Sequence, residues 1–189
     1  MMFTKKIWIC TFLSLFLTFN ATAKSGLKKE VDEKLIYGWL EWVKFENQGI
    51  SAKAKLDSGA KTSSLHAKNI EEFEKDGEEW VRFQFASDTK LDDQYFGKNA
   101  SRKVITIEAP LYRNVQIKQH TRSNVKRPVV VLPFKMGGRT FEAQFTLTDR
   151  KKFLYPVLLG RRFLERSAII DPSAKYLQTE PGCESTAAK

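Results

Sequence analysis

The stretch Lys55-Leu56-Asp57-Ser58-Gly59-Ala60 places an aspartate where an apolar, alternating segment meets a turn. Small or apolar residues at 52, 54 and 56 alternate with lysines at 53 and 55, and this period of two predicts a strand that runs into Asp57. Gly59 lets backbone approach a carboxylate, because it has no side chain in the way. Taken alone, Asp-Ser-Gly is a common tripeptide and favours an Asx-type turn, in which the aspartate bonds to its own backbone.

A second informative stretch, Val157-Leu158-Leu159-Gly160-Arg161, lies about one hundred residues downstream. It predicts a short apolar strand that ends at Gly160, followed by one or two helical turns over Arg161 to Arg166. Short apolar or alternating segments with frequent turn residues fill the rest of the chain and predict a mostly β fold with a closed or sandwich-like sheet. The strands expected are 36–45, 52–56, 81–85, 104–107, 129–134, 140–147, 156–159, 168–171 and 175–177.

Together the two stretches resemble the retropepsins, which carry an apolar-Asp-Thr/Ser-Gly-Ala motif and later two apolar residues, Gly-Arg and a short helix. The chain is still more similar to a bacterial family often labelled ATP-dependent zinc proteases. That resemblance covers about residues 36 to 177. It includes the run from Lys55 to Ala67 and the following segments: Gly38-Trp39, Trp80-Val81-Arg82-Phe83, Leu147-Thr148-Asp149-Arg150 and Leu158-Leu159-Gly160-Arg161.

The resemblance implies a retropepsin-like (acid protease) closed β-barrel with one short C-terminal helix, active as a two-fold dimer. A chain with one Asp-Ser-Gly has one such carboxylate, whereas a pair of carboxylates can share a proton and act as base and acid. The resemblance thus implies Asp57, Ser58 and Gly59 as catalytic residues. It implies Ala60, His66 and Arg161 as substrate-binding residues.

The sequence departs from the retropepsins at one point that concerns the site. Retropepsins usually have acidic residues after the motif, one of which pairs with the later arginine, but Lys61-Thr62-Ser63 follows here. Arg161 therefore needs another partner. No glycine-rich flap is evident, so the loop at 87–103 or the basic stretch 113–127 is expected to cover the site.

The zinc and ATP of the family label find no support in the residues. There is no His-Glu-x-x-His motif, and His66 and His120 are the only histidines. Catalytic zinc usually has three protein ligands; Asp57 and His66 would supply two, and no third is obvious. There is no phosphate-binding Gly-x-x-x-x-Gly-Lys-Ser/Thr loop either. The expectation is an enzyme with no metal and no cofactor.

The N-terminus has the layout of a secretory signal peptide, with Lys5 and Lys6, an apolar run from Ile7 to Phe19, and Ala21-Thr22-Ala23. An uncleaved anchor is the alternative. The expected divisions are a signal peptide at 1–23, a polar linker at 24–34, a peptidase domain at 35–177 and a disordered tail at 178–189. Cleavage removes Cys10 and leaves Cys183, which excludes an internal disulfide.

Cleavage would also remove two lysines from a chain of formal net charge +10, leaving +8. This balance favours an anionic partner, and export argues against nucleic acid as that partner. We therefore expect a periplasmic or otherwise exported homodimeric aspartic endopeptidase that hydrolyses acidic or glutamylated peptides, without a membrane span after signal cleavage. Two alternatives stay open: a non-catalytic envelope-binding domain of the same fold, and a zinc-dependent hydrolase.

Overall fold

The computed structural model of this chain describes residues 34–88, 103–117 and 125–178. The predicted signal peptide and most of the predicted linker, tail and 87–103 loop lie outside these residues. The strands are β1 (Leu35–Gly38), β2 (Leu40–Phe45), β3 (Ile50–Asp57), β4 (Ser63–His66), β5 (Lys68–Lys75), β6 (Glu78–Ala86), β7 (Val104–Pro110), β8 (Arg113–Ile117), β9 (Val125–Met136), β10 (Arg139–Thr148), β11 (Val157–Gly160) and β12 (Ala168–Asp171). The helices among these residues are a 3₁₀ turn, η1 (Glu46–Gln48), and α3 (Arg161–Ser167).

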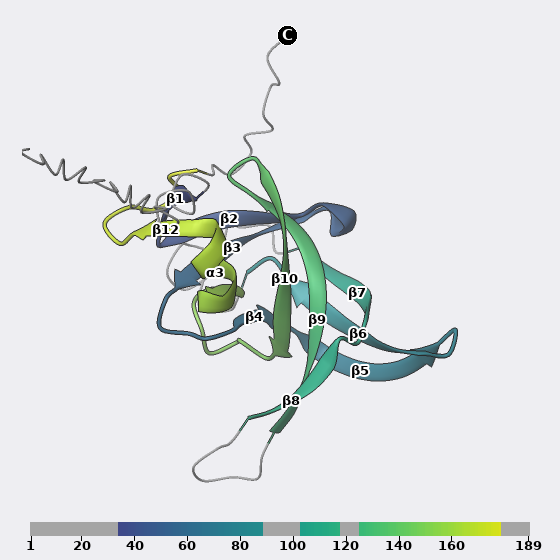
Figure 1. Cartoon of the computed structure of the whole chain (residues 1–189). Coiled ribbons are helices and arrows are strands. Elements are labelled where there is room, and N and C mark those ends of the chain that lie inside the picture. The colour runs from purple at the N-terminus through teal and green to yellow at the C-terminus, as the bar shows by residue number, and fades with distance from the viewer. Residues whose placement is uncertain (1–33, 89–102, 118–124, 179–189) are drawn as a thin grey trace, which may run out of the picture.

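Six strands close into a barrel. Their order is β10-β4-β11-β3-β2-β9, and pairing of β9 with β10 joins the two ends of the sheet. The β9–β10 hairpin turns through Gly137 and Gly138, whose φ angles of 57° and 73° are conformations that favour glycine. Strand β8 extends the sheet beyond β9 (Figure 1).

A separate antiparallel sheet, β5-β6-β7, packs against the barrel. Strand β6 alternates between the core and solvent, and its Val81, Phe83 and Phe85 are fully buried. Strand β5 has no buried residue and forms a hairpin with β6 through Asp76-Gly77. The end of this hairpin points away from the barrel (Figure 1).

Aromatic side chains fill the barrel. The Phe45 ring contacts Phe85, Phe134 and Phe145, with ring centroids 5.5, 6.1 and 5.9 Å apart. Each of these rings comes from a different strand, so the contacts fix the strands relative to one another. Such aromatic pairs contribute about 0.5–1.5 kcal/mol each beyond the area they bury.

The predicted fold class, a mainly β closed barrel with one short helix, is confirmed. The predicted strand at 36–45 divides at Trp39 because Gly38 belongs to a second pairing, β1 with β12. The predicted strand at 175–177 is wrong, since these residues form bends. Strands β4, β5 and β8 were not predicted: β4 and β5 lack a period of two, and β8 lies in the stretch expected to cover the site.

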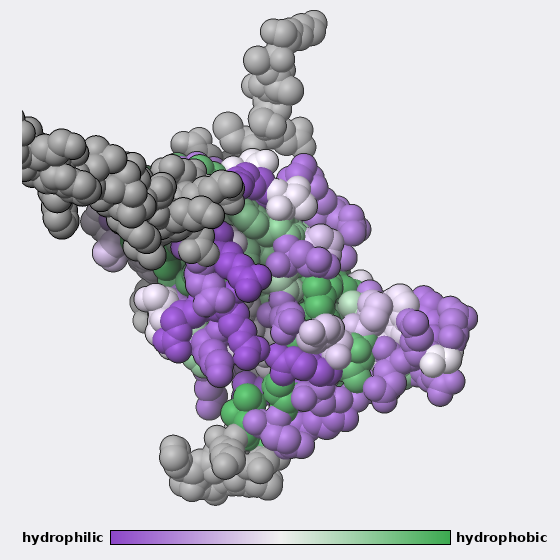
Figure 2. Space-filling view, viewed as in Figure 1, coloured by the Kyte–Doolittle hydropathy of each residue, from purple (hydrophilic) through white to green (hydrophobic). Residues whose placement is uncertain are grey.

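No helix among the described residues is long and apolar enough to cross a membrane. The surface in Figure 2 is hydrophilic over α3 and over the end of the β5–β6 hairpin.

Candidate functional site

Asp57 lies where the ends of two parallel strands meet. Strand β3 ends at Asp57, and β11 runs beside it with Gly160 opposite Asp57 in the register. Because the strands are parallel, the Asp57 loop (residues 57–60) and the start of α3 emerge at the same edge of the barrel. The two stretches singled out in the sequence are thus neighbours in space.

The Asp57 carboxylate is held by its own loop. The Gly59 N–H donates to Asp57 Oδ1 at 2.9 Å, and Lys55 Nζ lies 3.2 Å from Oδ2. A Cβ at position 59 would lie 3.1 Å from Oδ1, which is a tight contact. The motif therefore forms the Asx-type turn that the tripeptide alone favours, and at the same time it presents a carboxylate whose side chain is 25% exposed.

The pKa of the Asp57 carboxyl is lowered from its ordinary value. Partial burial acts to raise this pKa, but the hydrogen bond from Lys55, the N–H of Gly59 and the charge of Lys55 together outweigh it. Asp57 in the isolated chain is therefore an ionised acceptor at neutral pH.

Arg161 finds its partners in the Asp57 loop itself. Its Nη1 donates to the carbonyl oxygens of Ser58 and Gly59 at 3.1 and 3.5 Å, and its backbone N–H donates to Ala60 O at 2.8 Å. Backbone carbonyls take the place of the acidic partner that the sequence lacks. The structure thus brings together five of the predicted site residues: Asp57, Ser58, Gly59, Ala60 and Arg161.

His66, the sixth, is in the core and only 1% exposed. Its Nδ1 accepts the Arg150 N–H at 2.8 Å, so that nitrogen carries no proton. Asp149 Oδ1 approaches the same nitrogen at 3.7 Å, but without a proton on Nδ1 this approach is not an ion pair. In this structure His66 has a structural role.

Arg150 is a buried cation that belongs to one of the resembling segments, but no role in the site was predicted for it. It is 5% exposed; its Nε donates to Tyr155 O at 3.1 Å and its Nη1 to Ser64 Oγ at 2.7 Å. Burial lowers its pKa to about 10, and the charge of Asp57 opposes this shift. The sequence signal that could have indicated its burial is its place between a buried strand and the aromatic residues at 153 and 155.

The strand β4 connects the loop to this buried cation. The Gly160 N–H donates to Ser63 Oγ at 3.1 Å, one residue before the Ser64 hydroxyl that Arg150 binds. A Cβ at Gly160 would lie 2.6 Å from the carbonyl carbon of Thr62, so only glycine fits where the strands cross. Among the described residues, no three His, Cys, Asp or Glu side chains gather in a way that could hold a metal ion.

Comparison with known families agrees with this architecture. A family model named RimB-like, described as "Retropepsin-like aspartic endopeptidase RimB", matches residues 36–181. The chain belongs to the RimB-like family. The resemblance to retropepsin-like peptidases that the sequence implied is thereby confirmed.

A solved structure of a Legionella pneumophila protein of unknown function is similar to this RimB-like chain. It has 35% sequence identity and a TM-score of 0.62, and the match covers 76% of this chain and 98% of that one. The same fold is therefore found in a related protein of nearly the same extent as the matched region.

Curated relatives of the RimB-like chain carry a different name. Proteins of Shewanella pealeana and Desulfotalea psychrophila, each 34% identical, are named "Probable alpha-L-glutamate ligase". The matches cover 80% and 84% of this chain but 31% and 32% of those proteins. The chain thus spans about a third of the length of these relatives.

These names correct the expected activity. The sequence led us to expect an exported aspartic endopeptidase, a hydrolase, but the curated relatives are named for the ligation of glutamate. The expectation transferred the activity of the retropepsins along with their fold, and a fold does not fix a function. The RimB-like chain keeps the retropepsin-like barrel, while the activity expected from it is contradicted.

Proposed function

We propose that this chain is a peptide-recognition domain of an α-L-glutamate ligation system, and that it binds the glutamate-bearing end of a peptide at the Asp57 loop. The names of the curated relatives supply the glutamate. The match to about a third of their length favours one domain of such a system over the whole activity. The observation that carries the proposal is an ionised, partly exposed carboxylate surrounded by cations.

The chemistry of the loop suits a glutamyl peptide. Asp57 uses one lone pair for Gly59 and faces Lys55, and its other lone pairs can accept a peptide N–H or an α-ammonium group. Exposed Lys61 and Arg161 flank the loop and can attract side-chain carboxylates. A glutamate at the end of a peptide, with one peptide N–H and two carboxylates, is complementary to an anion beside several cations.

The Arg161 contacts keep this loop ready to bind. Its guanidinium bridges the carbonyls of Ser58 and Gly59, and its backbone N–H fixes Ala60. A loop already held in one conformation loses less conformational entropy on binding. The contacts of Arg161 therefore fix the conformation of the Asp57 loop before a peptide binds.

Isothermal titration calorimetry with a peptide that ends in four α-linked glutamates tests the proposal. Wild-type protein should bind it, and Asp57→Asn should bind about 10- to 100-fold more weakly, because a charge-assisted hydrogen bond contributes about 1.5–3 kcal/mol. Asp76→Asn, at the exposed hairpin turn, is the matched control and should bind like the wild type.

Two results would overturn the proposal. The first is equal affinity for a peptide with glutamines in place of the glutamates. The second is chromatographic evidence that the wild type, but not Asp57→Asn, shortens the peptide, since a recognition domain leaves its ligand intact.

A further inference from the structure

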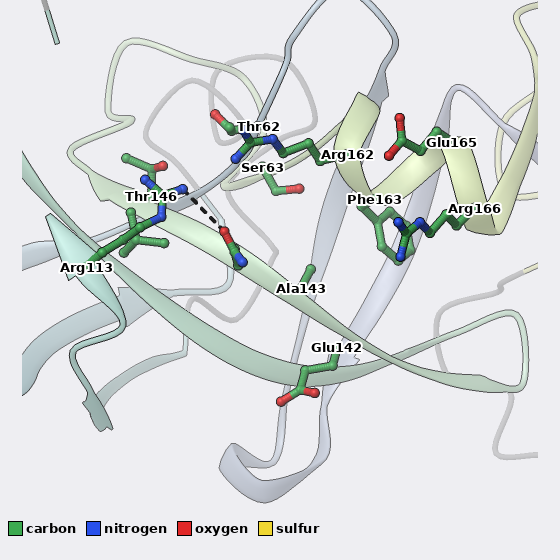
Figure 3. Close-up of a pocket in the computed structure, with 12 residues that line it drawn as sticks. Thr62, Ser63, Arg113, Glu142, Ala143, Thr146, Arg162, Phe163, Glu165 and Arg166 are labelled. Atoms are coloured by element: carbon green, nitrogen blue, oxygen red, sulfur yellow. Dashed lines mark hydrogen bonds between the residues drawn. The ribbon is translucent and has the colours of Figure 1, made fainter. Parts of the chain in front are cut away.

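A hollow of about 410 Å³ lies beside the Asp57 loop, and Asp57 itself does not line it. Its wall includes Thr62 and Ser63, which continue the chain directly from the loop, and residues of β8, β10 and α3 (Figure 3). We call it the arginine hollow, after three of its lining residues: Arg113, Arg162 and Arg166.

The three arginines come from elements far apart in the sequence. Arg113 belongs to β8, whereas Arg162 and Arg166 lie one helical turn apart on α3. Figure 3 shows Arg113 and Arg162 reaching toward the space near Thr62 and Thr146. Bringing like charges together is unfavourable unless an anion lies between them.

No described carboxylate pairs with these cations. Arg113 Nη2 donates to the neutral Gln144 Oε1 at 3.3 Å, and none of the ion pairs among residues 34–88, 103–117 and 125–178 includes Arg113, Arg162 or Arg166. Glu142 and Glu165 also line the hollow, and both are exposed. Glu142 points away from the two converging arginines (Figure 3).

The helix that carries two of the arginines is firmly attached. Phe163 is 7% exposed, and its ring lies 5.4 Å from Phe134 and 5.3 Å from Phe141, measured between centroids. The Arg162 N–H donates to Lys61 O at 3.2 Å, which ties the base of that side chain to the segment after Asp57. The guanidinium groups thus project from fixed backbone.

We propose that the arginine hollow is a second anchoring site for carboxylates of the same acidic peptide. This inference rests on the proposed function, which places the peptide end at the Asp57 loop. A planar guanidinium binds a carboxylate through two parallel hydrogen bonds, so Arg113 and Arg162 are suited to side-chain carboxylates. The site discriminates glutamate from glutamine by charge, and its affinity falls with salt because its arginines are partly exposed.

The experiment measures binding of peptides that carry two or six terminal glutamates to wild type, Arg113→Gln, Arg162→Gln and the double variant. The wild type should bind the longer peptide more tightly than the short one. In the double variant the ratio of these two affinities should fall by about 10-fold or more, while the affinity for the short peptide stays that of the wild type. Arg139→Gln removes the same charge from β10 outside the hollow and should behave like the wild type. Thermal unfolding establishes that each variant is folded.

The outcomes separate the two proposals. If the wild type binds neither peptide, the proposed function fails. If the wild type prefers the longer peptide and the double variant prefers it equally, the Asp57 loop proposal stands and the arginine hollow is wrong. Inorganic phosphate that displaces the longer peptide at equal concentration would also overturn the inference, because it would make the hollow a general phosphate site.

Discussion

The Lys55 side chain lowers the pKa of the Asp57 carboxyl more than any other group that acts against burial. Partial burial favours the protonated carboxyl, and the Lys55 ammonium at 3.2 Å reverses that preference with help from the Gly59 N–H. Lys55 is thus the side chain that contributes most to the lowered pKa of the Asp57 carboxyl. The consequence can be measured at the level of this one residue.

The variant Lys55→Gln should raise the pKa of the Asp57 carboxyl, measured by its ¹³C chemical shift in a pH titration. Lys44→Gln, which removes an exposed lysine of β2 that is not among the groups acting on Asp57, should leave the titration unchanged. The role given to Lys55 would be wrong if both variants titrated like the wild type.

The lowered pKa also has a consequence for stability. Because the unfolded chain binds the Asp57 proton more readily than the folded one, this carboxyl stabilises the fold above about pH 4, and the contribution is lost as pH falls through the folded pKa. Urea unfolding between pH 6 and 3 should therefore show a smaller acid loss in Lys55→Gln than in wild type. An equal loss in the two proteins would contradict this linkage.

At the scale of elements, the short strand β4 holds the site together. It lies between β10 and β11, and its side chains satisfy groups on both sides: Ser63 Oγ accepts the Gly160 N–H, and Ser64 Oγ accepts Arg150 Nη1. Polar residues form a buried strand here because their partners are buried too. This is why the Ser-Ser-Leu-His segment did not look like a strand in the sequence.

Arg150→Met should lower the free energy of unfolding by about 1–3 kcal/mol, because Ser64 Oγ and the Tyr155 carbonyl lose their buried donor. Chemical unfolding in urea measures the change. Lys152→Met, two residues away and exposed, should have little effect. Equal stability of the two variants would show that the Arg150 bonds do not support the fold.

Gly160→Ala tests the close crossing of β11 and the segment before β4. The added Cβ would lie 2.6 Å from both the carbon and the oxygen of the Thr62 carbonyl, so backbone must shift. Such overpacking typically costs about 1–3 kcal/mol. Ser51→Ala, at an exposed position of β3, is the control, and urea midpoints of both variants decide the outcome.

The two segments that the sequence singled out meet in space, whereas several strands around them were not predicted. The Asp57 loop and the Gly160-Arg161 turn were found because their residue types are unusual at strand ends, and parallel pairing brings them together. Edge strands such as β5, with no buried residue, have no alternation to detect. The partners of Arg161 are backbone carbonyls, which no residue pattern reveals.

At the scale of the whole molecule, the two ends of the described fold meet in a small parallel sheet. Within residues 34–88, 103–117 and 125–178, β1 and β12 pair only with each other. Ile36 and Ile169 are register partners and are 52% and 39% exposed. Isolated two-stranded sheets are marginally stable, and neighbouring exposed apolar side chains favour a contact with another chain.

We therefore propose that this small sheet forms the contact of a two-fold homodimer, the commonest symmetric assembly. Sedimentation equilibrium should give the mass of two chains for the wild type and of one chain for Ile36→Lys or Ile169→Lys, since a buried charge at the contact is unfavourable. Val104→Lys changes an equally exposed apolar residue on β7, in the other sheet, and should stay dimeric. A wild type that is monomeric at its highest soluble concentration would contradict the dimer, and dimeric Ile36→Lys and Ile169→Lys would place its contact elsewhere.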